Sequence, residues 1–175
     1  MNEKVIKARP FLSVLVILVC VGIDQLTKLY AINNLRELAD EIPVINKVFG
    51  LYYVENKGIS FSMLSSKTAF IIILTSIILL ILIYVLIRTP RTRYYMPFAI
   101  VMSVIIGGAS GNMIDRIFRG YVIDFIMLDF INFPIFNFAD ICVCVGLFVL
   151  VILIIFKYKD KDFDFVIPRK GEKVG

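Results

Sequence analysis

Residues 107–140 read GGASGNMIDRIFRGYVIDFIMLDFINFPIFNFAD, and they place four aspartates, two arginines and three asparagines between two long apolar runs. Ionisable side chains are unfavourable inside a membrane, where they usually face the bundle interior and mark a functional site. Asp124 and Asp140 are separated by Pro134. We expect a re-entrant turn across that gap to bring the two carboxylates together at one membrane interface. Asp129, between them, is expected to be a solvated loop charge.

The composition is typical of an integral membrane protein. Of 175 residues, 59% are hydrophobic, and the mean hydropathy is +0.88. A soluble domain has about 45–50% apolar residues. The length fits a single domain, residues 1–175. The net charge of +5 does not indicate nucleic-acid binding, because most basic residues sit beside apolar runs, where they act as topology signals.

Four apolar runs are long enough to cross the ~30 Å hydrocarbon core as helices. The sequence therefore predicts an all-α membrane protein with four transmembrane helices, at about residues 11–30, 68–87, 94–114 and 136–156. The first run is expected to be retained, because Val19, Cys20 and Val21 offer neither a small-residue cleavage site nor the small residue that precedes a lipoprotein cysteine.

The segments outside the spans differ in character. Residues 43–63 contain good strand formers and predict a short β element. The tail from Lys157 is charged, and we expect it to be solvated.

The positions of lysine and arginine predict the orientation in the membrane. The two tails and the turn at residues 88–93 carry twelve of them, whereas the opposite loops carry six or seven. We therefore expect both termini in the cytoplasm, and loops 31–67 and 115–135 on the outer face.

The absence of histidine removes several kinds of site. Without it, His-based triads, Cys–His dyads and the usual His-containing zinc sites are excluded. The three cysteines lie in apolar runs, and we expect them to pack as small hydrophobic side chains: Cys20, Cys142 and Cys144. We predict a reaction without a metal or another cofactor.

A pair of carboxylates suits such a reaction. Two carboxyl groups a few ångströms apart share one proton and titrate as a unit. The ionised member can take a proton from water while the protonated one polarises a peptide carbonyl. Asp124 and Asp140 are the candidates for this role. On spacing alone, helix caps, salt bridges or a proton relay explain them equally well.

Other polar residues near the pair have structural and functional interpretations. Asn56, Asn112 and Asn137 can bind a substrate backbone or buried protein groups. Asp115 and Arg116 are expected to form ion pairs or hold loop backbone, and Asp24 and Lys28, at i and i+4, an intrahelical pair. The glycines of the run are expected to let helices approach closely: Gly107, Gly108 and Gly111.

Three other functions are compatible with parts of the sequence. A Ser–Lys protease would use Ser60 or Ser62 with Lys57 or Lys67, but such a lysine must be desolvated to act as a base. A small proton-coupled transporter predicts acidic residues at mid-membrane rather than a polar cluster at the interface. An intramembrane protease of the GxGD type would need an aspartate after Gly-x-Gly, and neither candidate aspartate follows that pattern.

Five short motifs, in this order, resemble lipoprotein signal peptidase, also called signal peptidase II. They are DQLTK at 24–28, NKG at 56–58, GGASGNMIDR at 107–116, VIDF at 122–125 and FNFAD at 136–140. Each motif is weak alone, but five in order on four spans are highly specific. The resemblance covers about residues 11–156.

The resemblance implies an aspartic endopeptidase with Asp124 and Asp140 as catalytic dyad. It also implies a four-helix membrane fold with a small extracytoplasmic β-cradle and a short outer helix from region 31–67. The implied substrate is a diacylglyceryl-modified prolipoprotein in the bacterial cytoplasmic membrane, cut on the amino side of its lipidated cysteine, and the implied inhibitor is globomycin. Positions matching site-lining or supporting residues are Asn56, Gly58, Gly108, Asn112, Asp115, Arg116, Asn137 and Ala139, while Asp24 and Lys28 match polar structural positions.

Overall fold

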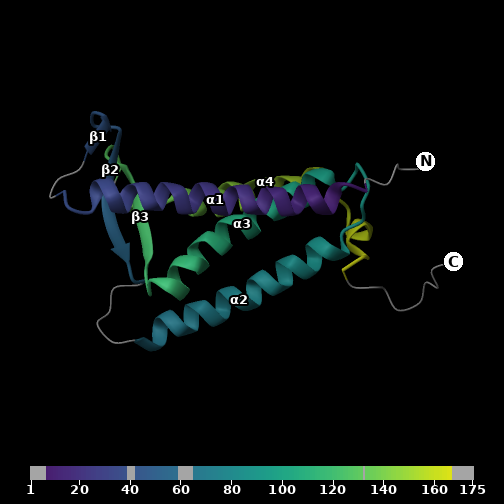
Figure 1. Cartoon of the computed structure of the whole chain (residues 1–175). Helices are drawn as coiled ribbons and strands as arrows, with labels where there is room; N and C mark the ends of the chain where they lie inside the picture. The colour runs from purple at the N-terminus through teal and green to yellow at the C-terminus, as the bar shows by residue number, and fades with distance from the viewer. Residues whose placement is uncertain (1–6, 39–41, 59–64, 132, 167–175) are drawn as a thin grey trace.

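The computed structural model describes residues 7–38, 42–58, 65–131 and 133–166, and four long helices dominate it (Figure 1). The helices are α1 (Arg9–Leu35), α2 (Ser65–Arg88), α3 (Met96–Phe118) and α4 (Phe138–Phe156). Each contains a segment long and apolar enough to cross a membrane. The prediction of four spans is confirmed, with shifted ends: α1 is longer at both ends than residues 11–30, and α4 begins after residue 136.

Helix α3 is the central helix of the bundle. Over its most apolar 18-residue window, 56% of α3 is buried inside the protein, whereas the corresponding shares are 17% for α1, 6% for α2 and 17% for α4. The outer helices therefore expose many leucine, isoleucine and phenylalanine side chains. Lipid chains are as apolar as these side chains, so a bilayer suits the exposed faces.

Close helix approach depends on glycine, as predicted for the run in α3. A Cβ added at Gly107 would lie 2.6 Å from Cβ of Cys20 on α1. A Cβ at Gly146 of α4 would lie 2.5 Å from Cγ1 of Ile105 on α3. Both distances are too short for any real side chain, so these glycines set how near the helix backbones come.

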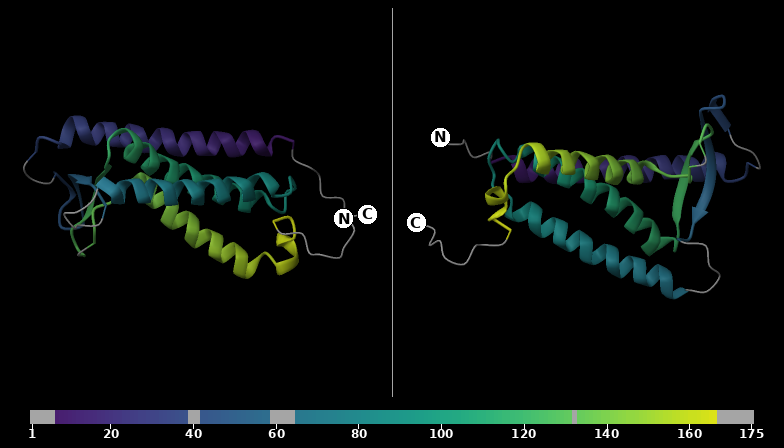
Figure 2. Two further views of the ribbon diagram at one scale, coloured as in Figure 1. Left: turned by 90° about the horizontal axis from the view of Figure 1, so that it is seen from below. Right: turned by 180° about the vertical axis from the view of Figure 1, so that it is seen from behind.

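A three-stranded antiparallel sheet lies across the end of the bundle opposite to the start of α1 and the end of α4 (Figure 2). Its strands, in spatial order, are β1 (Ile42–Ile45), β2 (Phe49–Asn56) and β3 (Val122–Leu128). The β element predicted for residues 43–63 is confirmed by β1 and β2. In region 31–67, helical structure among the described residues belongs only to the ends of α1 and α2, and residues 39–41 and 59–64 lie outside the description.

Strand β3 corrects the sequence interpretation, which placed this segment in a loop. Its residues Ile123 and Phe125 are buried against Ala31 and Leu35 of α1. Because successive strand side chains point to opposite faces, Asp124 points away from this cluster. Burial of one face of β3 therefore fixes the direction of the aspartate on the other.

The segment after α4 is folded, so the prediction of a solvated tail is wrong for residues 157–166. Tyr158 is 5% exposed and joins the core cluster around Phe98 of α3. A short 3-10 helix, η1 (Asp160–Phe163), brings Phe163 and Phe165 against the same cluster. Aromatic residues stand among the charged ones of this segment, and the apolar area that they bury stabilises its ordered structure.

Candidate active site

Asp124 is held at the end of β3 that adjoins α3. It is 2% exposed, and its partner in the sheet register is Val54 on β2. Its Oδ2 accepts a hydrogen bond of 2.8 Å from Asn56 Nδ2, and its Oδ1 accepts one of 2.6 Å from Asn137 Nδ2. Two side-chain amides therefore fix the orientation of this carboxylate.

Asp140 lies in the first turn of α4, where Asn137 is the N-cap. The Asp140 N–H donates to Asn137 Oδ1 at 3.0 Å, and the Asn137 N–H donates to Asp140 Oδ2 at 3.0 Å. This reciprocal capping box satisfies two N–H groups that the helix itself leaves free. Asp140 therefore does take part in a helix cap, the structural alternative for this residue, and its side chain uses only Oδ2 for the cap.

Two asparagines connect the carboxylates. Asn112 Nδ2 donates to Oδ1 of Asp140 at 2.8 Å, while Asn112 Oδ1 accepts a 3.1 Å hydrogen bond from Asn137 Nδ2. That same Nδ2 binds Asp124. A continuous chain of hydrogen bonds thus runs from Asp124 through Asn137 and Asn112 to Asp140, which confirms that the turn around Pro134 brings the two aspartates into one site.

The return of the chain between the aspartates is built on β3. Phe136 pairs with Ile126 as an antiparallel bridge, with its N–H donating to Ile126 O at 3.1 Å. Its carbonyl oxygen accepts from the N–H groups of Phe125 and Ile126. These bonds place the start of α4 directly beside the strand that carries Asp124.

Asn56 has a defined amide orientation. Its Oδ1 accepts a 2.9 Å hydrogen bond from the N–H of Gly58, a turn in which the side chain mimics backbone. Gly58 has φ +74°, a conformation that favours glycine. With Oδ1 occupied, Nδ2 is the atom that faces Asp124.

The environment of Asp124 favours its neutral form. Burial is the main cause that raises the pKa of this carboxyl to about 6, and the charge of Asp140 acts in the same direction. Hydrogen bonds from Asn56 and Asn137 act against the increase. A carboxyl of this kind can hold a proton near neutral pH and give it to a reacting group.

A second polar cluster lies deeper in the bundle and is neutralised within the protein. Lys28 Nζ lies 2.8 Å from Asp24 Oδ2 and 2.9 Å from Asp115 Oδ2, and all three side chains are fully buried. Lys28 also donates to Asn112 Oδ1 at 2.8 Å. The predicted Asp24–Lys28 pair is confirmed, and it supports the asparagine that holds Asp140.

Asp24 also positions the start of α4. Its Oδ1 accepts a 3.0 Å hydrogen bond from the N–H of Ala139, which is fully buried. Gly111 makes room for this carboxylate, because an added Cβ there would collide with Asp24. Gly108 has a parallel role: its added Cβ would lie 2.6 Å from the carbonyl oxygen of Ala139.

Asp115 and Arg116 serve different parts of the site. Asp115 accepts from the N–H of Ile123 at 3.3 Å, so it fixes the entry to β3 as well as pairing with Lys28. Arg116 donates to Asn112 O at 3.3 Å and lies near enough to Asp140 and Asp124 for electrostatic attraction. Arg116 thus supplies positive charge beside the two carboxylates.

Sequence reasoning assigned no site role to Gln25 or Arg119. Gln25 Nε2 donates to the carboxylates of Asp24 and Asp115, and Arg119 forms an ion pair with Asp115. The i, i+4 spacing of Asp115 and Arg119 on a helix was the available signal. Asp129, expected to be solvated, is half-buried, and its Oδ1 is enclosed without a hydrogen-bond partner in the described structure.

A cleft of about 710 Å³ opens beside Asp124. It is bounded by the end of β2 and the turn after it, and by the segment that precedes α4. The lining residues are Val54, Glu55, Asn56, Lys57, Gly58, Asp124, Pro134 and Ile135. Asp124 is therefore one wall of a cleft at the sheet end of the bundle. Ser60 and Ser62, needed by a Ser–Lys site, lie outside the described residues.

Known proteins resemble this chain over most of its length. The sequence model of a family described as "Signal peptidase (SPase) II" matches residues 16–156. A lipoprotein signal peptidase of Caldanaerobacter subterraneus subsp. tengcongensis is 42% identical over 130 residues, covering 74% of this chain and 86% of that protein. Another, from Clostridium acetobutylicum, is 38% identical over 136 residues, covering 75% and 86%.

Solved structures resemble the fold. A bacterial membrane enzyme determined by the in meso method at 2.3 Å resolution has a TM-score of 0.71 and 31% sequence identity, covering 100% of this chain and 99% of that one. A second such structure, at 1.9 Å resolution, has a TM-score of 0.70 and 30% identity, covering 91% and 99%.

Proposed function

This chain belongs to the signal peptidase (SPase) II family, whose members are membrane proteases that remove signal peptides from prolipoproteins, and we propose that it cuts the peptide bond by aspartic catalysis. Asp124 and Asp140 are the proposed dyad. The observation that carries the proposal is the hydrogen-bond chain through Asn137 and Asn112 that joins the two carboxylates.

The proposed reaction needs one proton on the pair. The ionised carboxylate takes a proton from a water molecule, whose oxygen attacks the scissile carbonyl carbon, while the protonated carboxyl donates a hydrogen bond to the carbonyl oxygen. The tetrahedral intermediate then collapses, and the pair returns a proton to the leaving amine nitrogen. The raised pKa of Asp124, about 6, supports a shared proton, which belongs to the pair rather than to one residue.

The surrounding amides have a positioning role in this proposal. Asn56 and Asn137 hold the Asp124 oxygens, so the carboxylate does not rotate between proton transfers. Arg116 limits the negative charge that builds up on the pair. Reacting groups held in this way avoid much of the entropy loss of a bimolecular reaction.

The proposed substrate is a prolipoprotein whose cysteine carries diacylglycerol, cut on the amino side of that cysteine. A lipidated cysteine stays at the membrane interface, and the cleft beside Asp124 lies at the sheet end of the bundle. We place that end at the outer face of the bacterial cytoplasmic membrane and both termini in the cytoplasm, from the distribution of basic residues. Globomycin-type cyclic peptides are expected to bind the same cleft.

The transporter alternative receives less support. Its candidate proton-coupled sites are Asp24 and Asp140. Asp24 is fully buried and neutralised by Lys28, and it accepts a hydrogen bond from the N–H of Ala139. A carboxylate with all of these partners is suited to holding helices together rather than to releasing protons.

The substrate assignment is tested with purified protein in lipid bilayers and two forms of one prolipoprotein, with and without diacylglycerol on the cysteine. Mass spectrometry identifies the new amino terminus. We expect cleavage immediately before the cysteine, and only in the lipidated form. Equal cleavage of both forms, or cleavage at another bond, would contradict the proposed substrate.

A further inference from the structure

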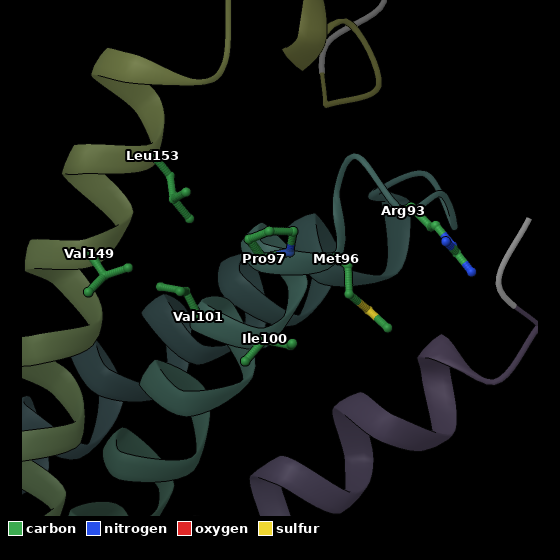
Figure 3. A pocket seen from close by; sticks show the side chains of 7 residues that line it. All are labelled: Arg93, Met96, Pro97, Ile100, Val101, Val149 and Leu153. Carbon is green, nitrogen blue, oxygen red and sulfur yellow. The ribbon is translucent and has the colours of Figure 1, made fainter. Parts of the chain in front are cut away.

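A second hollow lies at the opposite end of the bundle from the candidate active site. It is an apolar groove of about 730 Å³, with α3 as its floor and α4 along one side (Figure 3). Six apolar side chains line it: Met96, Pro97, Ile100 and Val101 from α3, and Val149 and Leu153 from α4. The groove opens on the surface that the bundle presents to lipid, so an acyl chain fits its chemistry.

Arg93 is the one charged residue among the described residues that line this groove. It lies in the turn between α2 and α3, and its side chain is exposed and extends away from Val149 and Leu153 (Figure 3). Arginine near a helix end places its guanidinium at the level of the lipid headgroups. Among the residues that the structure describes, no carboxylate forms an ion pair with Arg93.

The same end of the bundle carries further positive charge. Arg9 is 3% exposed and donates to Leu86 O at 3.2 Å, yet its Nε and Nη1 have no hydrogen-bond partner within the described structure. Arg91, in the same turn as Arg93, lies near enough to Arg9 for the two guanidinium groups to repel each other. Of the neighbouring carboxylates, Asp162 already accepts from Tyr94 and from the N–H of Lys159.

We propose that this groove is a binding site for one anionic phospholipid, whose acyl chain lies along α3 and α4 and whose phosphate contacts Arg93. Guanidinium groups bind phosphate oxygens in a bidentate manner. Basic pockets between transmembrane helices are suited to anionic headgroups, whereas a zwitterionic headgroup would bring its own positive charge near Arg93. This inference does not depend on the proposed proteolysis.

Native mass spectrometry of the full-length protein tests the site. The protein in detergent is given equal amounts of phosphatidylglycerol and phosphatidylcholine with the same acyl chains, and the retained lipids are counted. We expect the wild type to retain phosphatidylglycerol preferentially. Arg93→Gln should lower that retention about fivefold, the factor equivalent to about 1 kcal/mol, and leave phosphatidylcholine unchanged.

Arg91→Gln is the matched control, because Arg91 lies in the same turn and is exposed, but does not line the groove. It should retain phosphatidylglycerol like the wild type. Arg93→Lys keeps the positive charge but not the bidentate guanidinium, so it should retain more phosphatidylglycerol than Arg93→Gln and less than the wild type, which separates loss of binding from loss of folding. Val149→Phe fills the groove and should reduce the retention of both lipids.

Three results would overturn the proposal. The first is equal retention of the two lipids by the wild type. The second is an equal loss in the Arg91 and Arg93 variants, which would indicate diffuse surface charge. The third is complete displacement of phosphatidylglycerol by inorganic phosphate alone, which would indicate an anion site without a place for the acyl chain.

Discussion

The Nδ2 of Asn137 lies 2.6 Å from Oδ1 of Asp124, although Asn137 caps α4 and Asp124 belongs to β3. The backbone N–H of Asn137 binds the other aspartate, Asp140, at 3.0 Å. One residue therefore fixes both carboxylates relative to each other. If the pair is catalytic, this asparagine sets its geometry.

Asn137→Ala should lower kcat by about 100-fold, the order expected when a reacting group is displaced by about 1 Å. It removes the cap of α4 and the amide that holds Asp124, so the free energy of unfolding should also fall by about 1 kcal/mol. Both are measured on purified protein with a lipidated substrate. Asn34→Ala is the control, since Asn34 is exposed and binds only its own helix at Tyr30 O. Activity close to wild type in the Asn137 variant would show that the bridge has no catalytic role.

The pH dependence of kcat/KM should report the shared proton. Because the pKa of Asp124 is raised to about 6, the pair loses its last proton as the pH rises through that value, and kcat/KM should fall above it. Asn56→Ala removes a hydrogen bond that favours the ionised form, so the pKa of Asp124 should rise and the alkaline limb should move to higher pH. A limb that stays in place, or moves to lower pH, would contradict the assignment of Asp124.

Lys28→Met should destabilise the protein, although Lys28 has no direct bond to Asp124 or Asp140. The substitution leaves Asp24 buried without a cation and Asp115 with Arg119 as its only ion-pair partner among the described residues, which is expected to lower the stability by about 3–5 kcal/mol. The measurement is the thermal unfolding midpoint in detergent. Lys57→Met, at an exposed position, serves as the control. The double variant Lys28→Met/Asp24→Asn should recover part of the loss, because it removes the charge left without a cation.

Gly108→Ala tests the close approach of α3 and α4. The added methyl group would lie 2.6 Å from the carbonyl oxygen of Ala139 and 2.8 Å from Cβ of Cys142, so the start of α4 must move. Overpacking of this kind is expected to lower the stability by about 1–3 kcal/mol and to reduce activity through Asp140. Gly22→Ala is matched to it, since nothing lies within 4 Å of a Cβ added there. Equal behaviour of the two variants would exclude the steric role of Gly108.

The sequence predicted those features that depend on local pattern. Long apolar runs with few charges located the four spans, and i, i+4 spacing identified the pair of Asp24 and Lys28. The sequence pattern of residues 122–128 indicates a loop rather than a strand, because apolar and polar residues alternate only weakly where both faces of a strand are partly covered. The aromatic residues of the tail, such as Tyr158 and Phe163, were the overlooked signal that it packs on the bundle.

The connections between elements could not be predicted from pattern. That Asn112 and Asn137 bridge two aspartates depends on side-chain directions set by α3, β3 and the N-cap of α4 together. Gln25 of α1 reaches Asp115 of α3 only because the two helices pack closely at glycine contacts. Such contacts arise from tertiary packing, and spacing along the chain does not reveal them.

The most direct test of the central claim is the rate of cleavage of a diacylglyceryl-modified prolipoprotein by Asp124→Asn and Asp140→Asn in lipid bilayers. Asparagine keeps the shape of each side chain but cannot take up or release the proton, so each variant should insert normally and lose activity by roughly 10⁴-fold. Asp129→Asn, at the same sheet end of the bundle but without a hydrogen bond to the pair, should cleave at the wild-type rate. Full activity in either dyad variant would contradict the account.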